Sequence, residues 1–131
     1  LLLLGGEVVG LGGSEYLEVF HDRVAGIPVP VNLDFELRVQ KFLADMIGRA
    51  WIQSAHDCSE GGLLVTALES ALTAEPQLGF ELSASGNDPA HKALFGEGPS
   101  RVLITAGSHI FTMEGPSNWP AFANCSKAPA L

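Results

Sequence analysis

The sequence predicts an α/β fold, in the broad sense that includes α+β, because apolar residues recur in two different patterns. Short continuous aliphatic runs at 1–4 and 102–105 are typical of strands with both faces buried. Two longer segments, 35–50 and 63–72, repeat apolar residues at helical spacing. Helices packed on a sheet are therefore the expected architecture.

Composition restricts the class of protein. The 131 residues suffice for one domain or part of one, and 47% hydrophobic residues exclude a disordered chain. Lys and Arg number 7 against 15 Asp and Glu, and the net charge of -8 argues against nucleic acid or a membrane surface as a partner. Cys58 and Cys125 lie too far apart in sequence to indicate a disulfide framework or a structural zinc site, which fits a cytoplasmic protein.

The first residues, Leu1 to Leu4, follow no methionine, and so short an apolar run is neither a membrane span nor a signal peptide. We expect the chain to begin inside a strand of a longer polypeptide. A first strand without a neighbour would expose an edge, so we also expect marginal solubility.

A glycine-rich loop is predicted for residues 5–14. Its segment 10–12 begins like a dinucleotide-binding fingerprint, but the third glycine would fall on Glu15, and we reject that interpretation. Ser14 is instead expected to be the N-cap of a short helix that ends at about Phe20.

A proline-containing connector at 26–30 leads to the longest predicted helix. Either Asn32 or Asp34 can cap its first turn, and Gly48 lies near its end. Its buried face is expected to consist of Phe35, Val39, Phe42, Leu43, Met46, Ile47 and Ala50.

A strand from Trp51 leads to His56, a polar loop and a second helix. We expect Ser59 to cap this helix, because its hydroxyl can accept from an amide of the first turn. The apolar stripe is expected to be Leu63, Leu64, Ala67, Leu68, Ala71 and Leu72, with Thr66, Glu69, Ser70 and Thr73 opposite.

Beyond this helix, Phe80, Leu82 and Ala84 alternate with other residues and predict a half-buried strand. Residues 91–97 predict a helical turn that leads into a loop and then the strand at 102–105. Residues 107–131 show neither a helical nor a strand period.

The two glycine-containing helix starts are the candidate binding sites. Glycines there let a ligand or another backbone approach amides that favour an anion. Glu60 would repel a phosphate unless a cation intervenes, and a corner packed by the protein itself is the alternative. The candidate phosphate-binding residues are Gly12, Gly13, Ser14, His56, Asp57, Ser59, Glu60, Gly61 and Gly62.

Asp57 and Glu60 are the candidate ligands of a Mg²⁺ ion, which prefers oxygen; the alternative for Asp57 is a brace within the loop. His56, Asp57 and Ser59 contain the residue types of a nucleophilic triad. Neighbours on an extended segment point to opposite faces, however, and a hydrolase is therefore disfavoured.

Several motifs, in order and spacing, resemble one known family. They are Leu-Leu-Leu-Leu-Gly at 1–5, Leu-Gly-Gly-Ser-Glu-Tyr-Leu at 11–17, Ser-Ala-His-Asp-Cys-Ser-Glu-Gly-Gly-Leu at 54–63 and Leu-Phe-Gly-Glu-x-x-Ser-Arg at 94–101. Together they resemble the last domain of the synthetase subunits of the phosphoribosylformylglycinamidine synthase family, over about residues 1–106. The motif at 11–17 favours this family over aminoimidazole ribonucleotide synthetase and selenophosphate synthetase of the same superfamily.

The resemblance implies a three-layer α/β/α domain with a mixed sheet, present here as an incomplete copy truncated at its N-terminal strand. It implies an ATP-dependent, Mg²⁺-requiring ligase of purine biosynthesis that forms formylglycinamidine ribonucleotide. The implied partners are the N-terminal ATP-binding domains of the same synthetase, a glutaminase subunit or domain, and the ribonucleotide substrate. No catalytic residue carries over, and the isolated fragment is expected to be inactive and to bind no cofactor tightly.

The chain departs from the family in two places. Relatives usually have Gly-Glu-Ser-x-Ser-Arg where this chain has Gly-Glu-Gly-Pro-Ser-Arg at 96–101, which weakens a ligand role for that loop. Residues 107–131 do not match the family, and we interpret them as a frameshifted or vector-derived end. The alternatives for function are a docking domain that contacts no ligand and a domain of another superfamily member.

Overall fold

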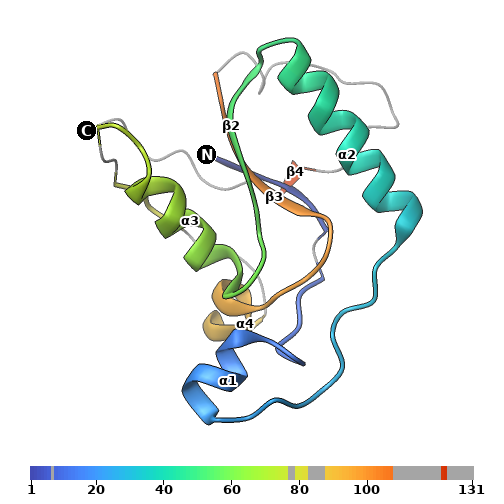
Figure 1. Ribbon diagram of the computed structural model, residues 1–131, viewed down its shortest axis with the longest axis vertical. Coiled ribbons are helices and arrows are strands. Elements are labelled where there is room, and N and C mark those ends of the chain that lie inside the picture. Colours follow the sequence, from blue (N-terminus) through green and yellow to red (C-terminus); the bar gives the residue numbers. More distant parts are fainter. Residues whose placement is uncertain (7, 77–78, 83–87, 108–121, 124–131) are drawn as a thin grey trace.

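The computed structural model describes residues 1–6, 8–76, 79–82, 88–107 and 122–123. Its elements are β1 (Leu2–Gly5), α1 (Glu15–His21), α2 (Leu33–Gly48), β2 (Ile52–Asp57), α3 (Gly62–Leu72), α4 (Ala90–Phe95), β3 (Arg101–Ala106) and β4 (Phe122–Ala123). Helices and strands are combined as the predicted α/β class requires (Figure 1). Among these described elements, no helix is both long enough and apolar enough to cross a membrane.

The strands form one sheet in the order β2-β3-β1-β4. β1 pairs with β3 from Leu2↔Ile104 to Gly5↔Arg101, and its other side pairs with β4. The expectation of an unpaired first strand is therefore wrong. All pairings between the described strands are antiparallel, so the parallel pair of a mixed sheet is not found within the described part of the chain.

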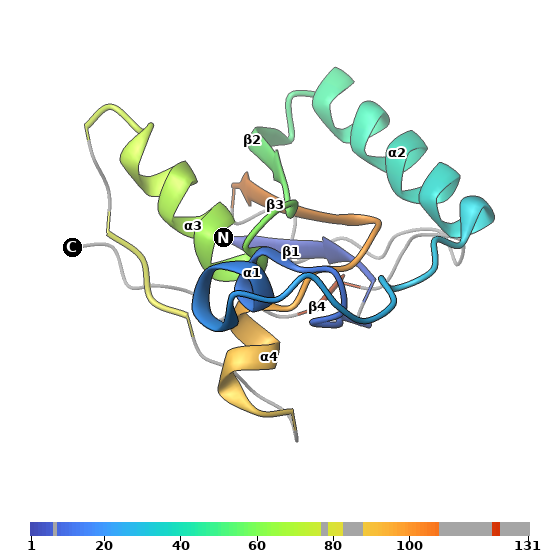
Figure 2. The same ribbon diagram turned by 60° about the horizontal axis from the view of Figure 1, so that its bottom comes forward.

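The side chains of the central strands β1 and β3 alternate between two apolar clusters. On one face, Leu2, Leu4 and Ile104 pack with residues of α2. On the other face, Leu3 and Leu103 pack with Cys58 and with Ala67 of α3. Figure 2 shows α2 and α3 on opposite sides of the sheet, which makes three layers and confirms that β1 is buried on both faces.

The first turn of α2 is capped locally. The Oδ1 atom of Asn32 accepts a hydrogen bond from the backbone N–H of Phe35 at 3.1 Å, so that Asn32, and not Asp34, is the cap. The buried residues of α2 belong to the predicted apolar face, although Ile47 is exposed because it lies beyond the edge of the contact with the sheet. The buried residues are Val39, Phe42 and Met46.

The buried face of α3 differs from the predicted stripe. Thr66 is only 2% exposed, whereas Leu68 and Leu72 are 44% and 63% exposed. Burial of Thr66 is tolerated because its hydroxyl donates to the carbonyl oxygen of Gly62 at 3.0 Å, within the helix itself. The helix is therefore rotated so that a small polar residue, next to Ala67, lies against the sheet.

Two further predictions concern irregular segments. Residues 79–82 form no strand; Phe80 and Leu82 pack on the α3 side of the sheet as irregular chain, and Ala84 lies outside the described residues. Phe122–Ala123 pairs with β1, a strand that the sequence of the tail did not predict. Most of 107–131 lies outside the described residues, so the interpretation of this tail stays a prediction.

Candidate functional site

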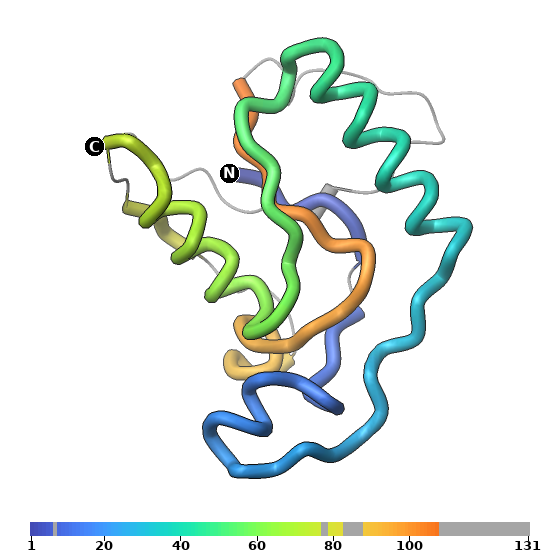
Figure 3. The backbone as a smooth tube through the Cα atoms, in the orientation of Figure 1, coloured from blue at the N-terminus to red at the C-terminus, as the bar shows by residue number. Residues whose placement is uncertain are grey.

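The two glycine-containing helix starts lie next to each other, on either side of the loop between α4 and β3. We call residues 10–15 the first corner and residues 57–62 the second corner. Figure 3 shows that the orange chain after α4 runs beside the green turn that begins α3 and the blue segment that begins α1. The sequence predicts each corner separately, and the fold brings them together.

Glu97 joins the two corners. Its Oε1 atom accepts hydrogen bonds from the backbone N–H of Glu15 and from that of Gly61, each at 2.9 Å. Its backbone exchanges two further hydrogen bonds with Gly10, also at 2.9 Å. The negative charge of the carboxylate suits the exposed amides of a helix start. One half-buried residue thus connects three segments of chain.

Nothing in the local sequence of either corner points to Glu97. The available signal is its place in the motif at 94–101, where a single carboxylate stands between two glycines. The sequence allows Glu97 to pair with Arg101 across its own loop, as a structural contact or a ligand contact, but it does not predict the contacts of Glu97 with the two corners.

The two serines that the sequence predicts as N-caps make other hydrogen bonds. Ser14 does occupy the N-cap position of α1, but its hydroxyl donates to the carbonyl oxygen of Leu11 at 2.7 Å. The hydroxyl of Ser59 donates to Oδ2 of Asp57 at 2.5 Å, and the N-cap position of α3 is Gly61. The position predicted for Ser14 is therefore confirmed, and the predicted Ser59 cap is wrong; neither hydroxyl accepts a hydrogen bond from an amide of its helix.

The corner glycines allow close packing of backbone on backbone. A Cβ atom on Gly62, which has φ of 67°, would lie 2.7 Å from the carbonyl oxygen of Gly96. A Cβ atom on Gly12 would meet the backbone of Ile27, and Gly13 has φ of 69°. The amides are also used, since those of Gly13 and Gly62 donate to carbonyl oxygens of their own chain. These contacts are the ones expected of a corner packed by the protein itself, and anion binding stays a prediction.

His56 is directed toward α3. Its Nδ1 atom lies 3.3 Å from the hydroxyl oxygen of Ser70, and its Nε2 atom lies 3.2 Å from Oε2 of Glu69. The hydroxyl of Ser70 donates to the backbone of Thr66. The ring therefore does not join Asp57 and Ser59 in a triad, in agreement with the unfavourable prediction for a hydrolase.

Asp57 is the ionised group of the second corner. The hydrogen bond from Ser59 lowers the pKa of its carboxyl below the usual 3.8, and a backbone amide and the nearby His56 act in the same direction against a small opposing effect of burial. Glu60, the next carboxylate along the chain, is exposed. The second corner thus presents a charged carboxylate at neutral pH.

These two carboxylates fit Mg²⁺ only as a partial ligand set. Within the described ranges of the chain, no three His, Cys, Asp or Glu side chains come together in a metal-binding arrangement. Mg²⁺ commonly binds one or two protein carboxylates together with water and substrate phosphates. A complete site would therefore need oxygen atoms beyond those that the described residues bring together.

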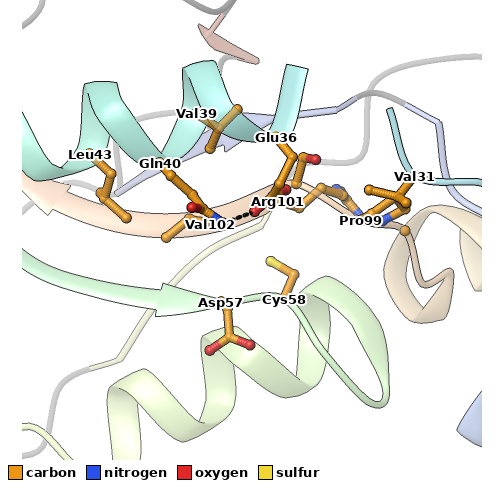
Figure 4. Close-up of a pocket in the computed structure, with 12 residues that line it drawn as sticks. Val31, Glu36, Val39, Gln40, Leu43, Asp57, Cys58, Pro99, Arg101 and Val102 are labelled. Carbon is orange, nitrogen blue, oxygen red and sulfur yellow. Dashed lines mark hydrogen bonds between the residues drawn. The ribbon is translucent and has the colours of Figure 1, made fainter. Parts of the chain in front are cut away.

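A groove of about 350 Å³ separates α2 from the ends of β2 and β3 (Figure 4). Glu36 and Gln40 of α2 line one wall, where the amide of Gln40 donates to Glu36 at 2.6 Å. Asp57 and Cys58 line the opposite wall, and the carboxylate of Asp57 points away from α2. Loop residues 98–100 and the first two residues of β3, Arg101 and Val102, complete the lining of the groove. The second corner therefore borders the groove.

Comparison with known proteins adds independent evidence. Residues 1–108 match the family described as AIR synthase related protein, C-terminal domain. Subunit PurL of phosphoribosylformylglycinamidine synthase from Trichormus variabilis is 44% identical over 110 residues, which cover 82% of this chain and 14% of the relative. The same subunit from a Synechococcus strain, JA-3-3Ab, is 47% identical over 104 residues, which cover 79% of this chain and 13% of the relative.

A third relative, from Synechococcus elongatus, is 36% identical over 129 residues, which cover 93% of this chain and 17% of the relative. The chain thus spans only 13% to 17% of the length of these relatives.

Proposed function

Because this chain belongs to the AIR synthase related family, as a C-terminal domain, we propose that it is one domain of the synthetase subunit of a phosphoribosylformylglycinamidine synthase. The observation that carries this proposal is the 44% identity to PurL over 110 residues, together with the family match over residues 1–108, which include both corners. The proposed activity is the ATP-dependent amidine-forming step of purine biosynthesis.

In this reaction ATP would transfer its terminal phosphoryl group to the formamide oxygen of formylglycinamide ribonucleotide and leave as ADP, with Mg²⁺ balancing the charge of its phosphates. Ammonia would then displace the phosphorylated oxygen as inorganic phosphate and form the amidine. This domain would contribute a wall of the ligand site through its two corners and the neighbouring groove. The ionised Asp57 is the group suited to a cation, and Ser59 holds it in place by the hydrogen bond to Oδ2. No residue of this chain is assigned to bond making or bond breaking.

The proposal includes partners. They are the N-terminal ATP-binding domains of the same synthetase, a glutaminase subunit or domain that supplies ammonia, and the ribonucleotide substrate. The proposal also includes a cytoplasmic location, which agrees with the two distant cysteines of the sequence.

A second candidate function is a docking domain that contacts no ligand. The observation that favours it is the use of the corner amides by Glu97 and by neighbouring carbonyl oxygens. The exposed apolar side chains of the connector between α1 and α2 agree with it, since Val24 and Ile27 are 81% and 89% exposed.

Exchange of domains tests the main proposal. The segment of the Trichormus variabilis PurL that matches this chain would be replaced by residues 1–108, and the formation of formylglycinamidine ribonucleotide would be assayed with ammonia. We expect an active chimera, because residues 1–108 contain β1, β2, β3 and both corners. A folded chimera that binds ATP but forms no product would refute the assignment and favour another member of the superfamily.

Substitution at the second corner distinguishes a ligand wall from a docking domain. In the full-length synthetase, Asp57→Asn combined with Glu60→Gln should raise the concentrations of Mg²⁺ and ATP needed for half-maximal rate. Glu81→Gln, at an exposed glutamate in irregular chain, is the control. Kinetics equal to those of the control, in a protein with unchanged melting temperature, would support docking alone.

A further inference from the structure

Glu97 lies where the two corners meet, although it belongs to neither. Both of its side-chain hydrogen bonds end on the same atom, Oε1, and both come from backbone amides at helix starts. The donors, Glu15 and Gly61, begin helices that are far apart in sequence. A single oxygen therefore determines how close the two helix starts can lie.

Neither helix start has a side-chain acceptor of its own to replace this oxygen. Ser14 caps no amide of α1, and Gly61 has no side chain with which to cap α3. The first amides of a helix have no partner within the helix, and they need an acceptor from elsewhere. Displacement of the Glu97 carboxylate would thus remove the acceptor from both corners at once.

The position of Glu97 is itself fixed by the backbone around it. Its N–H and C=O both pair with Gly10. A Cβ atom on the preceding Gly96 would meet the carbonyl oxygen of Lys92, and one on the following Gly98 would meet that of Val8. A side chain at position 98 therefore does not fit this backbone. The carboxylate extends from a rigid stretch of chain.

We propose that Glu97 is a positioning residue for the ligand site. By holding the amides of Glu15 and Gly61 on one oxygen, it sets the spacing between the first and the second corner. It thereby places the first corner, and Asp57 with the cation proposed for it, relative to a phosphate-bearing ligand. This inference rests on the proposed function, because the corners must contact the ligand for their spacing to affect binding. Glu97 itself does not contact the ligand, since its charge would repel a phosphate and Oε1 is already shared by two amides.

The test uses the full-length synthetase with Glu97→Ala, Glu97→Gln and Glu97→Asp. Glu18→Gln serves as the control, because Glu18 is an exposed carboxylate on the first turn of α1. Two readouts are compared: hydrogen exchange of the amides of Glu15 and Gly61, and the separate kcat and KM values for ATP with Mg²⁺ and for formylglycinamide ribonucleotide.

For Glu97→Ala we expect exchange to accelerate at both corners together, and KM to rise about tenfold while kcat changes less, because two hydrogen bonds to a charged group are lost. Glu97→Gln keeps an oxygen at the same reach, so its KM should stay within about threefold of the wild-type value. Glu97→Asp keeps the charge but is one methylene shorter, and it should resemble the alanine variant.

The proposal is overturned if exchange accelerates at one corner only or at neither. It is also overturned if the aspartate variant has the KM of the wild type, a comparison that remains decisive where the alanine variant does not fold. Hydrogen exchange of the two amides can be measured whether or not the protein is active. A wild-type protein without synthetase activity would therefore contradict the proposed function. The exchange rates of Glu15 and Gly61 in the Glu97 variants would still show whether Glu97 links the corners.

Discussion

α2 and α3 cover opposite faces of the same sheet, but their first turns depend on different parts of the chain. The amide of Phe35 in α2 is capped by Asn32, three residues before it in the sequence. The amide of Gly61 at the start of α3 is held by Glu97, which lies 36 residues away. The buried residues of α2 are large and apolar, whereas those of α3 are Gly62, Thr66 and Ala67.

The difference shows how the candidate site is held in place. α2 is stabilised by its own cap and by burial of apolar surface, and a change at the corners should leave it intact. α3 and α1 begin at corners that share one acceptor, so these two helix starts should respond together to a change in the loop between α4 and β3. The site-forming region is thus linked by hydrogen bonds between distant segments.

The largest expected effect concerns burial on the two helices. Met46 of α2 is 1% exposed and Leu72 of α3 is 63% exposed. We expect Met46→Ala to lower the free energy of unfolding by about 2–5 kcal/mol and Leu72→Ala to change it by about 0.5 kcal/mol or less. Denaturation with urea, followed by circular dichroism, measures both. Equal losses would mean that α3 also depends on its apolar residues.

The next effect separates two glycines. Gly62 has φ of 67°, and a Cβ atom there would lie 2.7 Å from the carbonyl oxygen of Gly96, while a Cβ atom on Gly48 in α2 would meet nothing within 4 Å. Gly62→Ala should therefore destabilise the fold by about 1–3 kcal/mol, and Gly48→Ala should stabilise it by about 0.5–1 kcal/mol. Opposite shifts in melting temperature are expected. A shift of the same sign in both variants would contradict the claim that close backbone packing at the second corner requires a glycine at position 62.

A smaller effect tests the independence of α2. Asn32→Ala removes the cap, and it should cost about 1 kcal/mol of the free energy of unfolding. Asp34→Ala, in the same turn, is the matched control, because Asp34 is not the cap. Hydrogen exchange should become faster at the first turn of α2 and remain unchanged at Glu15 and Gly61. Faster exchange at those two amides would indicate that the caps of α2 and α3 are coupled after all.

The smallest effect is the pH dependence of the second corner. The Ser59 hydrogen bond holds the pKa of Asp57 below 3.8, so its contribution to stability is complete above that value and is lost as pH falls through the lower pKa of the folded state. Carbon-detected titration of the Asp57 carboxyl should give a midpoint below 3.8, and Ser59→Ala should move it upward. A midpoint at or above 3.8 in the wild-type protein would contradict the claim that the hydrogen bond from Ser59 lowers the pKa of Asp57.

Patterns within one element predict much of this fold. Burial in the core produces a pattern of apolar residues that can be read from the sequence. The apolar runs predict β1 and β3, and the helical spacing of Val39, Phe42 and Met46 predicts the buried face of α2. The glycines likewise marked both corners correctly. The glycines could not reveal which group accepts the hydrogen bonds of the corner amides, because only the tertiary fold brings Glu97 close to them.

The errors have the same physical origin. Ser14 and Ser59 are residue types that cap helices, but their hydroxyls donate to oxygen atoms within their own turns. The carboxylate of Glu97 accepts the hydrogen bonds of the helix-start amides instead. Thr66 is buried because a hydroxyl can bond to its own helix, an option that a count of apolar residues does not include. The choice between such alternatives depends on neighbours that are distant in sequence.

The most direct test of the shared acceptor is a measurement on the wild-type protein by nuclear magnetic resonance. Scalar couplings across hydrogen bonds join an amide nitrogen to the carbon that bears the accepting oxygen. We expect the amide nitrogens of both Glu15 and Gly61 to couple to the side-chain carboxyl carbon of Glu97. Coupling of only one of them, or of neither, would contradict the conclusion that one carboxylate holds the two corners together.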